Sequence, residues 1–156
     1  MIKAKRILAN FDARIPKIEV KPCNKKIGSK VIIVSKMHDE TKGEKVKVKI
    51  KFKDVAGIDF RVNFFDSFIG CEAGGLYCFD DKETINRIMH GIFLRRKEIC
   101  LLEGDYSYDA DDEADILNIF DFDGEFTRNI DQYKAYVQNV DSGVYIIVCK
   151  ELVIEK

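Results

Sequence analysis

In the stretch EKVKVKIKFKD, residues 44–54, charged and apolar side chains alternate strictly from Lys45 to Lys53. Successive side chains of a β-strand point to opposite faces, so the alternation predicts a strand. One face then carries Val46, Val48, Ile50 and Phe52, and the other carries Lys45, Lys47, Lys49, Lys51 and Lys53. The segment therefore predicts a sheet with a buried face and a lysine-bearing face.

Several other segments also have the composition of strands. They are KIEVKP (17–22), KVIIVSKM (30–37), the alternating start of GIDFRVNFFDSFIGCE (57–72), LYCF (76–79), DQYKAYVQNV (131–140) and GVYIIVCKELVIEK (143–156). The polar HDETKG (38–43) predicts a turn before the lysine strand, and Asp141-Ser142-Gly143 predicts a hairpin turn. Strands that follow one another through short turns favour an antiparallel sheet.

One segment, FDDKETINRIMHGIFLRRKE (79–98), has the pattern of an amphipathic helix. Asp80 is expected as N-cap, with Glu83 completing a capping box. Arg95, Arg96 and Lys97 suit the negative end of the helix dipole. A single apolar stripe follows helical spacing and consists of Ile85, Ile88, Met89, Ile92 and Phe93.

The predicted fold class is α+β, a twisted and mainly antiparallel sheet with one main amphipathic helix packed on it. Residues 114–122 fit a helix and a strand equally well. The length of 156 residues, two prolines and the lack of a repeat or linker indicate a single domain over residues 1–156.

The apolar runs and the cysteines indicate a soluble, cytoplasmic protein. No apolar run approaches the roughly 18 residues of a membrane span, and the first residues lack the apolar core of a secretory signal. Five cysteines, Cys23, Cys71, Cys78, Cys100 and Cys149, form no CxxC pair. Buried free thiols in a reducing compartment are therefore expected.

Charge is divided unequally along the chain, although the net charge is only −1. Residues 1–53 hold 16 Lys and Arg against 5 Asp and Glu, and residues 54–156 hold 10 against 22. Ten carboxylates lie between Glu103 and Glu125 without one Lys or Arg. This acidic tract is a candidate docking surface for a basic partner, because dense negative charge steers cationic proteins. A solvated loop without a partner remains the alternative.

The acidic tract does not have the pattern of a metal site. An EF-hand loop that starts at Asp109 or Asp121 places Ala114 or Phe126 where glycine is needed. The sequence has no zinc framework either, and the two histidines, His38 and His90, are expected to be solvated. Neither a metal nor another cofactor is therefore expected.

Two alternative functions remain open. The Lys45–Lys53 face of the predicted strand has the charge to bind nucleic acid or another anionic ligand, although a solvated sheet face explains it equally simply. Asp12, Glu19 and Lys21 also have the outline of a metal-dependent nuclease, in which two carboxylates hold Mg²⁺ and a lysine steadies the attacking water.

Two blocks resemble a known group of proteins. GIDFRVNFFDSFIGCEAG (57–74) is similar to the middle of small immunity proteins from bacterial contact-dependent inhibition and polymorphic toxin systems. QYKAYVQNVDSGVYIIVCKELVIE (132–155) resembles the tyrosine-containing hairpin with which several of those proteins end. The resemblance covers about 40 residues and identifies no specific family within the group.

The resemblance implies a non-enzymatic cytoplasmic protein that neutralises the toxin domain encoded beside it, often a nuclease. It transfers no contact residue, so the contact surface is inferred from charge, and from aromatic side chains suited to interface hot spots. Membranes and nucleic acids are not expected as partners under this hypothesis. The candidate toxin-binding residues are Asp105, Tyr106, Tyr108, Asp109, Asp111, Asp112, Glu113, Asp115, Asp121, Asp123 and Glu125, with Phe120 and Phe122 interleaved.

Overall fold

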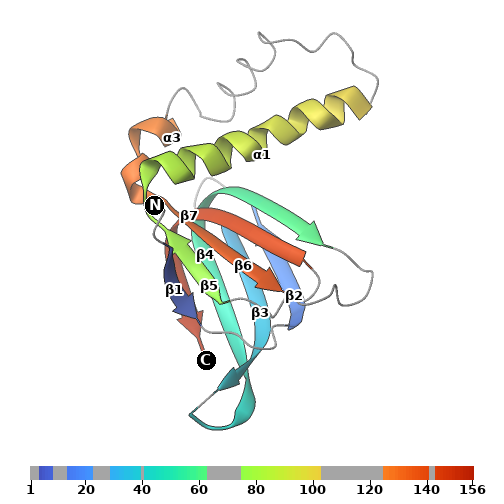
Figure 1. The fold of residues 1–156 in the computed structure, drawn as a ribbon, viewed down its shortest axis with the longest axis vertical. Coiled ribbons are helices and arrows are strands. Elements are labelled where there is room, and N and C mark those ends of the chain that lie inside the picture. The colour runs from blue at the N-terminus through green and yellow to red at the C-terminus, as the bar shows by residue number, and fades with distance from the viewer. Residues whose placement is uncertain are drawn as a thin grey trace.

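A computed structural model describes residues 4–8, 14–22, 29–39, 41–62, 75–102, 125–140 and 143–156 (Figure 1). The strands are β1 (Lys5–Leu8), β2 (Arg14–Lys21), β3 (Lys30–Asp39), β4 (Glu44–Val62), β5 (Leu76–Phe79), β6 (Lys134–Val140) and β7 (Gly143–Glu155). The helices are α1 (Lys82–Leu102), the short α3 (Glu125–Arg128) and the 3₁₀ turn η1 (Ile130–Gln132).

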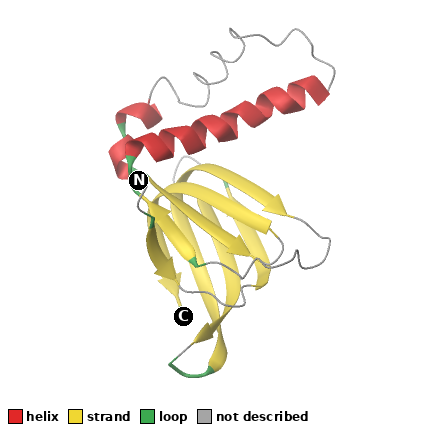
Figure 2. Ribbon diagram, viewed as in Figure 1, coloured by secondary structure: helices red, strands yellow, loops and turns green. Residues whose placement is uncertain are grey.

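All seven described strands form one open antiparallel sheet in the order β1-β5-β6-β7-β4-β3-β2. Helix α1 lies across one end of this sheet, and the β3–β4 hairpin projects from the other end (Figure 2). The prediction of an antiparallel sheet with one main helix is thus confirmed, and the sheet makes up most of the described fold. Strand β1 was not predicted, because KRIL is too short to show an alternation.

Strand β4 is the longest element of the sheet, with 19 residues. It joins the lysine-rich segment and the following GIDFRV segment, which the sequence suggested as separate stretches. The alternation of side chains between the two faces is interrupted there, since Asp54 has a φ of 52° and the pairing with β7 shifts between Val55 and Gly57. Because of this irregularity, Phe52, Val55 and Ile58 all pack on the same core although they are three residues apart.

The main core lies on one face of the sheet. The alternation in β4 is confirmed there, because Val48, Ile50 and Phe52 are completely buried. Aromatic rings fill the centre, with Phe52 in edge contact with Tyr136 and Tyr145 at centroid distances of 5.7 and 6.2 Å. Strands β3, β5, β6 and β7 supply the other buried members, which include Val31, Ile33, Leu76, Cys78, Ile147 and Cys149.

One polar pair is buried inside this core. The Tyr145 hydroxyl donates a hydrogen bond of 2.5 Å to Oε1 of Gln138, and both residues are almost completely buried. Nε2 of Gln138 has no hydrogen-bond partner among the described residues. A buried amide without a partner for its N–H groups weakens the core, because those groups have lost their bonds to water.

The apolar stripe of α1 packs on the opposite face of the sheet. Ile85 and Met89 are buried there, and Ile88 and Ile92 are partly buried, as the helical spacing predicted. The sheet contributes Ala135 and Val148, and the segment after the acidic tract contributes Phe126 and Ile130. The side chain of Phe93 is outside the described part of the structure.

The prediction for the start of this helix is wrong by one residue. Asp81 is the N-cap, because its carboxylate accepts a hydrogen bond of 2.8 Å from the N–H of Thr84. A hydrogen bond from the Thr84 side chain, together with this backbone bond, lowers the pKa of Asp81. With Asp81 as N-cap, Thr84 takes the third helical position, where the predicted capping box required Glu83.

The helix also continues past its predicted end. It runs to Leu102, and no basic residue lies in its last turn. Arg95 therefore does not serve the dipole at the C-terminal end. Its guanidinium instead lies 3.8 Å from the Asp59 carboxylate on β4, and so ties the helix to the sheet.

Substitutions at two glycines near α1 should change the stability of the protein in opposite directions. A Cβ on Gly57 would lie 2.7 Å from Sδ of Met89, whereas a Cβ on Gly91 would meet nothing within 4 Å. We expect Gly57→Val to lower the free energy of unfolding by about 1–3 kcal/mol, because the core is already filled. Gly91→Ala should raise it by about 0.5–1 kcal/mol, since glycine is a poor helix former. Urea unfolding checks both, and equal effects would contradict the packing described.

The Tyr145–Gln138 pair should show strong coupling in a double-mutant cycle. Tyr145→Phe leaves the Gln138 amide entirely unpaired and should cost about 1–3 kcal/mol of stability. In the double variant Tyr145→Phe, Gln138→Leu both polar groups are gone, and the stability should return close to that of the parent. Denaturant unfolding of the four proteins measures this, and simply additive losses would contradict it.

Candidate functional site

The candidate toxin-binding residues lie almost entirely outside the described part of the chain. This holds for Asp105, Tyr106, Tyr108, Asp109, Asp111, Asp112, Glu113, Asp115, Asp121 and Asp123, and for residues 114–122 as a whole. Glu125 opens α3, but its side chain is not described. The acidic surface therefore stays a prediction.

The elements on either side of the acidic tract are described, and both belong to the helical layer. Helix α1 ends at Leu102, and the chain re-enters the described structure at α3, beside the beginning of α1 (Figure 1). The rings of Phe126 and Tyr133 lie 4.9 Å apart, and Lys82 on α1 pairs with Asp131 in η1 at 2.8 Å. The tract is thus attached to the fold at the end of the molecule opposite the β3–β4 hairpin.

The strongest concentration of charge among the described residues lies on strands β2, β3, β4 and β7. We call this surface the lysine face. On β3 and β4 its lysines alternate with buried positions of the main core, and the register places the residues of β2 and β7 on the same side of the sheet. The lysine face consists of Lys17, Lys21, Lys30, Lys36, Lys45, Lys47, Lys49, Lys51 and Lys53, together with Glu19, Glu151 and Glu155.

The register of the sheet places several of these lysines directly opposite one another. Lys30 faces Lys53 on β4 and Lys21 on β2, and Lys36 faces Lys47. The sequence pattern pointed only to the lysines of β4. The period-two spacing of Lys17, Glu19 and Lys21 was a usable signal for β2, but the register that joins these rows cannot be read from it.

All three glutamates of the lysine face are already paired with its lysines. Glu151 contacts Lys53 at 2.9 Å, and Glu155 contacts Lys51. Glu19 contacts Lys21 at 3.1 Å and Lys17 at 3.5 Å. The hydrogen bond from Lys51 lowers the pKa of Glu155, and that from Lys21 lowers the pKa of Glu19. Among the side chains that the structure describes on this face, nine lysines against three glutamates leave a net charge of six positive.

The same face also covers two apolar side chains of β3. Ile32 and Val34 point outward among the lysines, yet each is only 9% exposed. Ile32 lies between Glu19 and Lys51, and Val34 lies between Lys17 and Lys49. The aliphatic stems of long side chains can cover such residues while their charged ends stay in water. The face is therefore charged at its surface without an exposed apolar centre.

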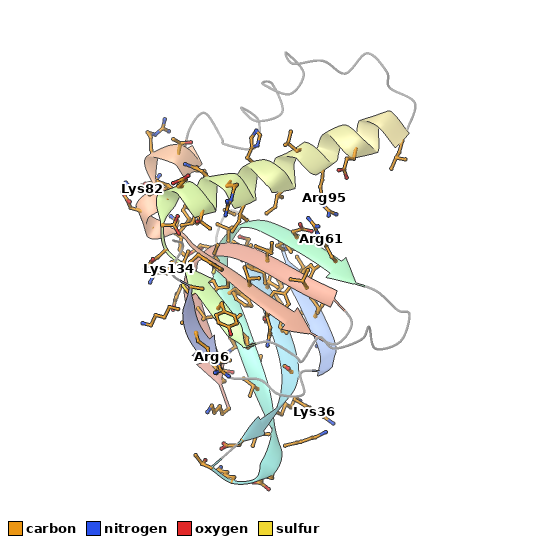
Figure 3. The ribbon with its side chains drawn as sticks, viewed as in Figure 1. Arg6, Lys36, Arg61, Lys82, Arg95 and Lys134 are labelled. Atoms are coloured by element: carbon orange, nitrogen blue, oxygen red, sulfur yellow. The ribbon has the colours of Figure 1, made fainter. Side chains whose placement is uncertain are left out.

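A second charged cluster joins β4 to α1. The Asp59 carboxylate is 9% exposed and accepts hydrogen bonds from the Arg61 guanidinium at 3.1 and 3.3 Å. Arg95 approaches the same oxygen from the helix, so the two arginines converge on it (Figure 3). Both arginines compensate a carboxylate that the packing of α1 has removed from water, which gives this cluster a structural role.

The described residues do not assemble the suggested nuclease site. Asp12 lies outside them, and Glu19 is occupied by its ion pairs with Lys17 and Lys21 on β2. Within the described ranges, no three His, Cys, Asp or Glu side chains gather as a metal site would require. The nuclease therefore stays an untested alternative.

The thiols that the structure describes are buried, as predicted. Cys78 and Cys149 are free cysteines in the main core. Burial raises the pKa of the Cys149 thiol to about 12 and also raises that of Cys78. Neither is a reactive thiolate near neutral pH. Cys23, Cys71 and the Cys100 side chain lie outside the description, His90 is exposed on α1, and His38 belongs to β3 rather than to a turn.

Comparison with known proteins does not extend this picture. No family model matches the chain, and neither a curated protein nor a solved structure is found to be similar. Among the helices that the structure describes, none has both the length and the apolar character that crossing a membrane requires.

The buried thiols predict a loss of stability at alkaline pH. Between the ordinary thiol pKa of 9.0 and about 12, the folded protein keeps the Cys149 proton while the unfolded chain releases it. The free energy of unfolding should therefore fall as pH rises through this range, by up to about 1.4 kcal/mol per pH unit from this one group. Urea unfolding from pH 8 to 11 measures the slope.

The slope should become shallower in Cys149→Ala, because this variant no longer has the titrating group. Val148→Ala is the matched control, since it also opens a cavity at a completely buried position but removes no proton. If Cys149→Ala and Val148→Ala show the same dependence on pH, the buried thiol does not contribute.

Proposed function

We propose that this chain is a bacterial immunity protein that binds and neutralises a cognate toxin domain through its acidic tract. The first support is the sequence, in which residues 103–125 contain ten carboxylates and no Lys or Arg. Such a density of negative charge attracts and orients a protein with a positive substrate groove, as nucleases have. The partner proposed is therefore a basic toxin domain, most simply a nuclease.

One observation from the structure supports this proposal more than any other. The lysine face carries its own acidic partners, Glu19, Glu151 and Glu155, from neighbouring positions of the sheet. In addition, the acidic tract is attached at the end of the molecule opposite the β3–β4 hairpin (Figure 1). Four lysines of the lysine face, Lys17, Lys21, Lys51 and Lys53, are thus compensated without any acid of the tract.

The attachment of the acidic tract also suits a docking element. Phe126, Ile130 and Met89 share one apolar cluster, and the Lys82–Asp131 ion pair adds a polar contact to it. A contact surface that is mounted on packed helices loses less conformational entropy on binding than one on a free tail. Tyr106 and Tyr108 would act as aromatic anchors among the carboxylates, which is the composition of many interface hot spots.

The proposal is tested with the toxic C-terminal domain of a large secreted protein, if the neighbouring reading frame encodes one. Co-expression of this chain should restore growth to cells that produce the domain. The triple variant Asp111→Lys, Asp112→Lys, Asp115→Lys should slow association by about tenfold or more at low salt, with the difference shrinking as salt rises. Surface plasmon resonance across a salt series measures the rates.

A matched control reverses three exposed acids outside the acidic tract, namely Glu44→Lys, Asp80→Lys and Glu98→Lys. It changes the net charge equally and should retain most of the association rate. Circular dichroism verifies that both variants are folded. An unchanged rate in the tract variant, or a neighbouring domain that this chain fails to neutralise, would refute the proposal.

A further inference from the structure

The lysine face contains like charges that the fold itself does not require. Lys36 and Lys47 are direct cross-strand neighbours, and Lys30 has a lysine on both sides, Lys21 and Lys53. Like charges directly opposite each other destabilise a sheet. Threonine or glutamate at one member of each pair would preserve the alternation without repulsion. The arrangement therefore points to a ligand that supplies the missing negative charge.

The chemistry of this face favours a polyanion that presents its charge at regular intervals. Lysines repeat every second residue from Lys45 to Lys53, which corresponds to a spacing of about 7 Å along β4. The row extends over about 27 Å, and duplex DNA carries roughly sixteen phosphate charges along the same length. Lysine donates from three N–H groups as a compact point charge, which suits phosphates but gives no bidentate contact to a base.

We propose that the lysine face binds the phosphate backbone of duplex DNA without reading its sequence. A single strand fits less well, because binders of single strands combine positive charge with aromatic side chains on which bases stack. The described outward-facing side chains among the lysines are Glu19, Ile32, Val34, Glu151, Val153 and Glu155, and none of them is aromatic.

The width of the face favours B-form DNA over duplex RNA. Strands lie about 4.8 Å apart, so the lysine-bearing strands β2, β3 and β4 span about 10 Å. The major groove of B-DNA is about 12 Å wide, which lets the long lysine side chains of β2 and β4 reach toward phosphates on both sides of the groove. The major groove of A-form RNA is deep and narrow, and its phosphates are arranged differently.

This inference is independent of the proposed immunity function. The lysine face extends along β3 and β4 from the hairpin to Lys30 and Lys53, whereas the acidic tract is attached beside α1 and α3 (Figure 1). In Figure 3, Lys36 lies in the hairpin half of the sheet, and Lys134 lies near the start of α1. Lys36, Lys47 and Lys49 lie on the strands next to the hairpin and make no described contact with the helical layer, so each function can be lost without the other.

The experiment measures binding of the full chain to a short random-sequence DNA duplex by fluorescence anisotropy, from about 50 mM to about 200 mM salt. The test variant is Lys36→Gln, Lys47→Gln, Lys49→Gln, which spares the lysines of the ion pairs. We expect its affinity at the lowest salt to fall by about tenfold or more. The slope of log affinity against log salt should lose about 0.9 for each phosphate contact removed.

The matched control is Lys5→Gln, Arg87→Gln, Lys134→Gln, which removes the same charge from exposed positions on β1, α1 and β6. It should bind DNA within about twofold of the parent, because charges more than a Debye length away are largely screened. Circular dichroism and urea unfolding establish that all three proteins are folded. The fold survives glutamine at these positions because none of the substituted side chains is in the core.

Four results would overturn the inference. The duplex fails to bind the parent at the lowest salt, or the test variant and the control bind it equally. Single-stranded DNA of the same sequence or duplex RNA binds at least as tightly as duplex DNA. Vesicles that contain anionic lipid bind as tightly as the duplex, which would assign the face to a membrane surface. Preference for duplex DNA together with selective loss in the test variant supports it.

Discussion

The alternation of side chains along β4 is the constraint on which the rest of the described structure depends. Its inward residues, among them Ile50 and Phe52, form the centre of the main core, and neighbouring strands must present apolar residues opposite them. Because the side-chain period of a strand is two, a shift of one residue would bury the lysines and expose the core. That cost fixes the register, and the register in turn creates the lysine face and the opposed lysine pairs.

Local patterns predicted the elements well, and they failed where long-range geometry decides. The apolar stripe of α1 and the alternation of β4 are strong periodic signals, and both are confirmed. The helix start was placed one residue early, since Asp80 and Asp81 are chemically equivalent caps and only the backbone selects Asp81. The continuation of β4 through Asp54 could not be predicted either. Asp54 has a positive φ, and a non-glycine residue in that conformation usually marks a turn and not the middle of a strand.

For the charged segments, too, the sequence predicted the local composition but not the arrangement that depends on strand pairing. The acidic tract is visible in composition alone, and its role in binding stays a prediction. For the lysine face, composition suggested the row on β4, but the contribution of β2 and β3 requires the pairing of Lys21 with Lys30 and of Lys30 with Lys53. Pairing between strands depends on which apolar sets meet in the core. No local pattern specifies it, although β2 and β3 were both expected as strands from the sequence.

The charges of the lysine face can be compared with those of the whole chain. A chain with a net charge of −1 could neutralise itself by placing its acids against its lysines. The three glutamates on the lysine face pair with four of its nine lysines, and the sheet still sets lysine against lysine at Lys36 and Lys47. Like charges set side by side in this way cost stability through repulsion within the lysine face. They also produce a positive local field, which favours ligands of negative charge.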